Sequence, residues 1–190
     1  VDYVECWVTE FKERFCENPN FLSEINEEFD EKMFDSIGIF CTCAENYNIH
    51  LWNQFADGGR GFCVGFATKK LLENKQIFGT CGPVNYYSPD NKPIISNLSF
   101  SMEERLIKIL LRINSIPIEY SDEKEYRISK SNCSERKIVL DPSYYKEIIL
   151  GPCIDPNHEA EIREIAQCML PNVPILRAKY NLQFNFIWIE

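Results

Sequence analysis

The segment Cys41–Phe66, CTCAENYNIHLWNQFADGGRGFCVGF, constrains the fold more than any other part of the sequence, because it combines strand, helix and turn signals in a compact unit. The apolar, β-rich run over residues 37–43 predicts a buried strand. A second strand is predicted over residues 62–66, where Phe62, Val64 and Phe66 alternate with smaller residues.

A short helix is predicted between these strands, over Ile49–Ala56, with Asn46 or Asn48 as its N-cap. Gly58 and Gly59 can adopt the positive φ that ends such a helix. The GGRG sequence also suits a phosphate-binding loop, but those loops usually lie between a strand and the start of a helix. We therefore expect a turn here, with an anion site at Arg60 as the alternative.

Helical signals also occur at both ends of the chain and in its middle. Apolar residues at helical spacing predict helices over residues 1–17 and 21–34. Ser101 and Glu104 form a capping-box sequence that opens a helix through Ile113. Asp155 followed by Pro156 predicts the start of another helix, which runs to about Leu170.

Further short strands are predicted over residues 84–87, 125–129, 137–140, 146–150, 175–180 and 182–189. Helices followed by many short strands favour an α+β fold with a mixed, largely antiparallel sheet and flanking helices. A chain of 190 residues suits one domain over 1–190, with a helical N-terminal segment (1–36) and a core (37–190).

The chain is acidic, with 20 basic and 29 acidic residues and a formal net charge of -9. Such a surface repels phosphate backbones, so we expect no sequence-independent nucleic-acid binding. No run of about 18 apolar residues occurs, so we expect no membrane span.

The nine cysteines are odd in number and lie mainly in apolar segments, which favours reduced thiols in a cytoplasmic protein. Cys41 and Cys43 would point to the same face of a strand. A metal site there would need two more ligands, and the chain has only His50 and His158. We therefore expect no metal, and we expect the thiols to pack in the core.

Trp52 and Phe55 lie three residues apart on the predicted helix and should share a face. Such a pair usually belongs to the core, and the alternative is that one ring stacks on a planar ligand. Asp57 at the helix end faces an unfavourable dipole, so it needs a compensating partner, for which Arg60 is the nearest candidate.

A polar cluster in the sequence YSDEKEYR, residues 120–127, is the second candidate site. Strand alternation would place Glu123, Glu125 and Arg127 on one side, with Tyr126 and Ile128 facing the core. Two carboxylates beside an arginine can stabilise a developing cation, or the cluster can be a cross-strand salt bridge. The residues alone leave both interpretations open.

The order of five segments, LWNQFADGGRGFCVGF, VNYYSPDNKP, IPIEYSDEKEYRI, YYKEIILGP and VPILRAKY, resembles a widespread bacterial family of domains of unknown function. The resemblance covers about residues 37–189. Members usually begin with a strand-and-helix segment that nothing in residues 1–36 matches, so the family fold is expected to be incomplete here.

The strand around Glu125 is also similar to the glutamate-bearing strand of ADP-ribosyltransferases. This resemblance implies NAD as the substrate, with Glu125 and Glu123 as catalytic carboxylates. It further implies that Trp52 or Phe55 contacts nicotinamide and that Arg60 or Arg127 contacts the pyrophosphate. A protein or nucleic acid would be the acceptor. The alternative is a non-catalytic interaction or sensor module in a phage-defence or mobile-element context.

Overall fold

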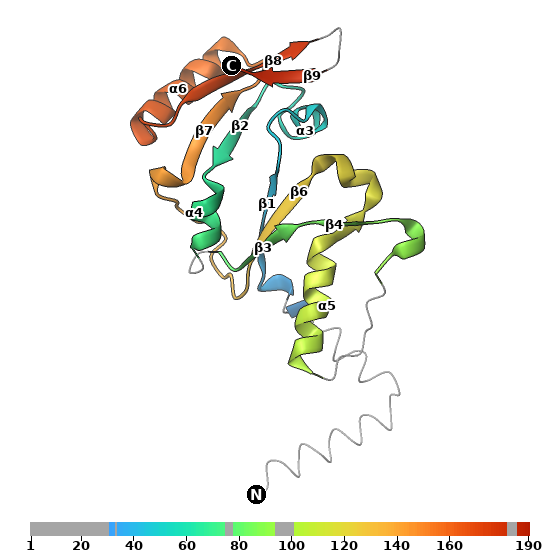
Figure 1. Ribbon diagram of the computed structural model, residues 1–190. Helices are drawn as coiled ribbons and strands as arrows, with labels where there is room; N and C mark the ends of the chain where they lie inside the picture. The colour runs from blue at the N-terminus through green and yellow to red at the C-terminus, as the bar shows by residue number, and fades with distance from the viewer. Residues whose placement is uncertain (1–30, 33, 75–77, 94–100, 182–185) are drawn as a thin grey trace, which may run out of the picture.

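The computed structural model of the chain describes residues 31–32, 34–74, 78–93, 101–181 and 186–190. Within these residues the fold is α+β, with helices packed around antiparallel and mixed sheets (Figure 1). This confirms the predicted fold class. The predicted helices over 1–17 and 21–34 lie outside the described residues, except that 31, 32 and 34 are helical.

The helices are α3 (Ile49–Phe55), α4 (Thr68–Glu73), α5 (Met102–Asn114) and α6 (Pro156–Met169). The 3-10 turns are η1 (Pro89–Asn91), η2 (Ile118–Glu123) and η3 (Pro142–Tyr144). The strands are β1 (Gly38–Cys43), β2 (Phe62–Phe66), β3 (Thr80–Pro83), β4 (Asn85–Tyr87), β5 (Ser115–Pro117), β6 (Glu125–Lys130), β7 (Tyr145–Leu150), β8 (Ile175–Asn181) and β9 (Phe186–Ile189). In the described part of the chain, no helix has the length and apolar character needed to cross a membrane.

The first sheet has the order β1-β6-β3, and both outer strands run antiparallel to β6. Its apolar face carries Ile128, which is buried and packs with Leu71 and Phe78. Phe40 of β1 lies beside this cluster and meets Phe66 of β2 edge to face, with 5.5 Å between the ring centroids. Aromatic packing therefore joins the first sheet to the second.

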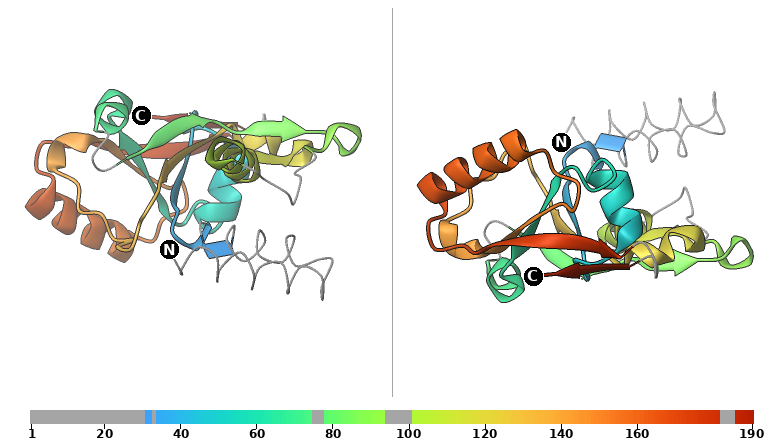
Figure 2. Two further views of the ribbon diagram at one scale, coloured as in Figure 1. Left: turned by 90° about the horizontal axis from the view of Figure 1, so that it is seen from below. Right: turned by 90° about the horizontal axis from the view of Figure 1, so that it is seen from above.

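The second sheet has the order β2-β7-β8-β9. Strands β7 and β8 are parallel, and α6 lies in the crossover between them, far from α5 (Figures 1 and 2). Asp155 caps this helix by accepting a hydrogen bond from the amide of Asn157, at 2.8 Å, and Pro156 occupies the first turn. The start of α6 was therefore predicted correctly.

Helix α3 begins and ends as the sequence predicts. The side chain of Asn48 accepts hydrogen bonds from the amides of His50 and Leu51. Gly58 and Gly59 have φ values of 65° and 81°, which other residues adopt only with strain. The amides of Gly151 and Cys153 donate to the carbonyls of Gly61 and Gly59, at 2.9 Å each, so this turn is bonded to the end of β7.

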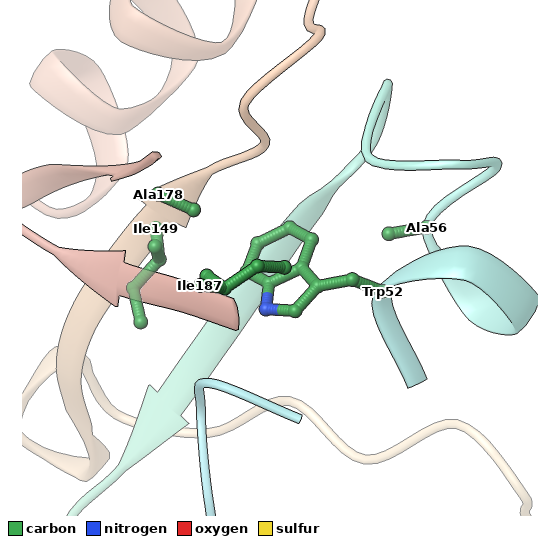
Figure 3. Packing of buried hydrophobic residues seen from close by; sticks show 5 residues of the cluster. All are labelled: Trp52, Ala56, Ile149, Ala178 and Ile187. Atoms are coloured by element: carbon green, nitrogen blue, oxygen red, sulfur yellow. The ribbon is translucent and has the colours of Figure 1, made fainter. Parts of the chain in front are cut away.

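Trp52 is the central residue of the larger core cluster and is only 4% exposed. Its ring packs with Ala56, Ile149, Ala178 and Ile187, which come from four different segments of the chain (Figure 3). Its indole Nε1 donates a hydrogen bond to the carbonyl of Asn46, at 2.7 Å. The core interpretation of Trp52 is therefore correct.

The cap of α5 also matches its prediction. Ser101 Oγ accepts from the amide of Glu104, and Glu104 Oε2 accepts from the amide of Ser101, both at 3.1 Å. After α5 the chain forms β5, which pairs in parallel with β4. Strand β5 leads directly into η2 and then into β6.

The predicted strand over residues 137–140 was wrong, because these residues form no strand and Val139 is 84% exposed. A strand needs a partner. Both sides of β6 and of β7, the strands that flank this segment in the sequence, are already paired. Leu140 is partly buried against the cluster of Leu71, Phe78 and Ile128, and the rest of the run is exposed.

The prediction that the thiols pack in the core was also largely wrong. Among the described cysteines only Cys133 is buried, Cys63 is intermediate, and Cys41, Cys43, Cys81, Cys153 and Cys168 are exposed. All of these are free thiols. Cys6 and Cys16 lie outside the described residues.

Replacement of Trp52 by alanine is predicted to lower the free energy of unfolding by about 3 to 5 kcal/mol, because it leaves a large cavity in the core. Phe55→Ala is the matched control, since Phe55 is 72% exposed, and it should change stability by only about 0.5 kcal/mol. Chemical denaturation measures both. Similar losses for the two variants would contradict this description of the core.

Candidate functional site

Glu125 and Arg127 form a two-pronged ion pair on the central strand β6. Arg127 Nε donates to Glu125 Oε1 at 2.8 Å, and Nη2 donates to Oε2 at 2.9 Å. The side chains of Glu125 and Arg127 are only 10% and 18% exposed. Strand alternation predicted that these two side chains share a face, and the structure confirms it. Such bidentate pairs are the strongest carboxylate contacts that arginine makes.

Neighbouring elements hold this pair in place. Arg127 Nη1 donates to the carbonyl of Ile113, in the last turn of α5. The backbone amide of Glu125 donates to the hydroxyl of Tyr86 on β4, at 2.8 Å. The pair therefore lies where β6, α5 and β4 meet, and its orientation is fixed from both sides.

Cys41 is the third member of the site, because it lies directly opposite Arg127 on β1. Burial raises the pKa of Glu125, but hydrogen bonds from Arg127 and Cys41 and the guanidinium charge outweigh burial, so the net pKa is lowered. Cys41 is exposed as a whole residue, but partial burial of its thiol, with the hydrogen bond to Glu125, raises the pKa of that thiol to about 11. Glu125 is therefore ionised and Cys41 protonated at neutral pH.

Glu123 lies in η2 rather than in the strand, so the predicted strand alternation does not extend to it. Lys124 separates it from β6 with a left-handed φ of 46°, which breaks the alternation. Glu123 is half-buried. Burial and the charge of Glu125 raise its pKa, in the opposite direction to that of Glu125.

The two faces of β6 differ from the prediction in one further respect. Ile128 faces the core, but Tyr126 is 41% exposed and Glu125 is buried. Tyr126 lies opposite Thr42 and Pro83 near the beginning of the strand, outside the cluster that covers Ile128. The polar face is the one bonded to the end of α5, through Arg127.

The residues predicted to bind NAD differ in burial and in the residues that they contact. Trp52 lies in the core, whereas Phe55 is exposed and does not share its packing. Arg60 pairs with Asp57 through Nε and Nη2, at 2.9 and 2.8 Å, as predicted. Only Arg127 of this group contacts Glu125.

The turn after α3 does not offer its amides to an anion. The amides of residues 58–61 donate to the carbonyls of Asn53, Trp52, Asp57 and Ala56, respectively. A phosphate-binding loop needs such amides unpaired. The glycines therefore end the helix, as the sequence favoured, and the amides of this turn are already used in hydrogen bonds within it.

The sequence interpretation did not include Cys41 and Tyr86 in this site. Cys41 joins it through the β1–β6 register, and Tyr86 joins it through a contact between β4 and β6. Both contacts join residues that are far apart in the sequence, so no local sequence pattern indicates them. In the described part of the chain, no three histidine, cysteine, aspartate or glutamate side chains are grouped so that they could hold a metal ion.

A family model described as "Protein of unknown function (DUF2971)" matches residues 51–128. The match includes α3 from Leu51 onward, its glycine turn, Glu125 and Arg127, and is shorter than the resemblance predicted over residues 37–189. It is consistent with a family of unknown function and adds no biochemical activity. Neither the curated proteins nor the solved structures contain a match to the chain.

Arg127→Ala is predicted to lower the free energy of unfolding by about 3 to 5 kcal/mol, because it leaves the Glu125 carboxylate buried without its partner. Arg60→Ala removes an arginine from an exposed pair and should cost less than about 1 kcal/mol. Urea unfolding of both variants measures the difference. Equal losses would contradict the assignment of Arg127 to a buried pair.

The ion pair also predicts a dependence of stability on pH. The pKa of Glu125 is lower in the folded than in the unfolded chain, so its stabilisation is complete at neutral pH. It should diminish as pH falls below the ordinary glutamate pKa and disappear below the folded pKa. Unfolding free energies of wild type and Glu125→Gln should therefore converge on acidification, and a constant difference would contradict the pair's ionisation.

Proposed function

We propose that the chain cleaves the bond between nicotinamide and ribose in NAD, as an ADP-ribosyltransferase-like enzyme or an NAD glycohydrolase. The observation that supports the proposal is the opposite shift of two neighbouring carboxyl groups. The pKa of Glu125 is lowered and that of Glu123 is raised. Surroundings that separate the pKa values of two titratable groups are typical of acid–base sites.

In the proposed step, the bond between ribose C1′ and the nicotinamide nitrogen breaks. Its electron pair remains on nitrogen, so nicotinamide leaves as a neutral molecule and needs no proton. The positive charge passes to the ribose, where the ionised Glu125 stabilises it. Each carboxylate oxygen has two lone pairs, so the bonds from Arg127 leave capacity for a ribose hydroxyl.

Glu123 then acts as the general base. A water molecule or an acceptor hydroxyl bonds to C1′ through its oxygen and transfers its proton to the Glu123 carboxylate. A raised pKa makes this carboxylate a stronger base than an ordinary glutamate. The acceptor in the transfer reaction is a hydroxyl of a protein or a nucleic acid.

The proposed nucleotide contacts come from exposed residues of the α3 segment. Helix α3 begins beside η2, since the Asn48 side chain donates to the carbonyl of Asp122. The exposed ring of Phe55 is available for stacking on a base. Arg60 would exchange Asp57 for the pyrophosphate, whereas Trp52 is excluded by its place in the core.

A non-catalytic interaction or sensor module is the second candidate, and a specific observation favours it. Both oxygens of Glu125 are bonded to Arg127, and Arg127 also holds the end of α5. A purely structural clamp would have this arrangement. In that case Glu125 would contribute to stability and have no effect on NAD.

Incubation of the full chain with NAD should release nicotinamide, detected by chromatography. Glu125→Gln and Glu123→Gln should each reduce the rate by roughly 100-fold. The wild-type rate should rise with pH as Glu123 ionises, and Glu123→Gln should lose this rise. Glu161→Gln on the exposed surface of α6 is the matched control.

Thermal melts show whether each variant is folded. Glu125→Asp keeps the carboxylate charge and serves as the conservative variant at this position. No nicotinamide from the folded wild type would refute the catalytic proposal and favour the interaction module. Equal rates of nicotinamide release by wild type and Glu125→Gln would show that Glu125 takes no part in the reaction.

A further inference from the structure

Helix α5 has exposed apolar side chains on the face that does not point into the core. Ile109 and Ile113 are buried, at 3% and 4% exposure, whereas Ile107, Leu110 and Leu111 are 52%, 39% and 39% exposed. By the periodicity of an α-helix, the three exposed side chains lie within about 100° of its circumference. We call Ile107, Leu110 and Leu111 the α5 stripe. A helix that is apolar on two faces is normally covered on both.

The chain that precedes residue 31 reaches the described structure beside this stripe. Residues 34 and 35 are helical, and the guanidinium of Arg112 lies over the ring of Phe34, 4.5 Å from its centroid. This is the distance of a cation–π contact. Arg112 directly follows Leu111 in α5, so the contact fixes the end of the N-terminal segment against the helix that carries the stripe (Figure 1).

The sequence of the first 17 residues predicts an apolar surface that can cover this stripe. Helical spacing is followed by Val4, Trp7, Val8, Phe11 and Phe15. An isolated amphipathic helix of this length is only marginally stable in water, and in proteins such helices gain their stability by packing the apolar face. A helix over residues 1–17 would therefore need an apolar surface to pack on.

The connection from this segment to the described chain is long enough to reach the stripe. Residues 18–30 span about 25 Å if 18–20 are extended and 21–30 are helical, as the sequence predicts. Helix α5 has 13 residues and is therefore about 20 Å long. Because the segment is tethered, its effective concentration at the stripe is on the order of millimolar. This favours it over a second copy of the chain or another protein.

We infer that residues 1–17 form a helix that packs Trp7, Phe11 and their apolar neighbours on the α5 stripe. The inference goes beyond the proposed function and does not depend on it. The last turn of α5 holds Arg127 through the carbonyl of Ile113. A docked N-terminal helix therefore supports the element that orients the Glu125–Arg127 pair.

Photo-crosslinking in the full chain tests the inference. With p-benzoylphenylalanine in place of Phe11, illumination should give crosslinks to α5 of the same chain, identified by peptide mass spectrometry. A mixture of isotopically light and heavy chains separates crosslinks within one chain from those between two copies. The same probe in place of Phe55, which is exposed on α3 and lies well away from α5 in Figure 1, should give no crosslinks to α5.

Ile107→Glu places a charge in the α5 stripe and should reduce the crosslink yield of the Phe11 probe roughly tenfold. Leu72→Glu is the matched control, because Leu72 is 45% exposed on α4, and it should leave the yield unchanged. Circular dichroism checks that both variants are folded. Absence of crosslinks to α5, crosslinks only between light and heavy chains, or equal yields with and without Ile107→Glu would overturn the inference.

Discussion

The cost of burying two opposite charges on the central strand of the first sheet governs how the neighbouring elements are arranged. An arginine and a glutamate removed from water stabilise a fold only if their geometry is good and their remaining hydrogen-bonding groups are satisfied. Here Arg127 meets Glu125 with two bonds and uses a third for the end of α5, and Tyr86 bonds the backbone of the same strand. The positions of α5 and β4 against β6 depend on this arrangement.

The described part of the chain has two apolar clusters. One cluster surrounds Trp52, and the other lies behind Ile128. Trp52 belongs to the first cluster and also fixes Asn46 through its indole nitrogen. The same ring thus packs in the hydrophobic core and holds the connection between β1 and α3. The proposed activity uses this rigid support, since oriented charges act strongly where water is largely excluded.

Local signals in the sequence were sufficient to predict caps, helix ends and the salt bridge within a turn. Asn48, the Ser101–Glu104 box and Asp57–Arg60 each interact over a few residues, so their geometry follows from helix and turn chemistry alone. The location of Cys41 opposite Arg127 depends on strand register, and the failure of the strand over 137–140 depends on which edges are already paired. The exposure of Phe55 likewise depends on where α3 docks. Features that depend on contacts between residues distant in the sequence have no short-range sequence pattern.

The backbone contact between the turn after α3 and the end of β7 has a consequence for how the molecule can change shape. Gly151 approaches the carbonyls of Gly59 and Gly61 so closely that any side chain there would collide with them. The turn after α3 and the end of β7 are joined by two main-chain hydrogen bonds, so a motion that separates them has to break both.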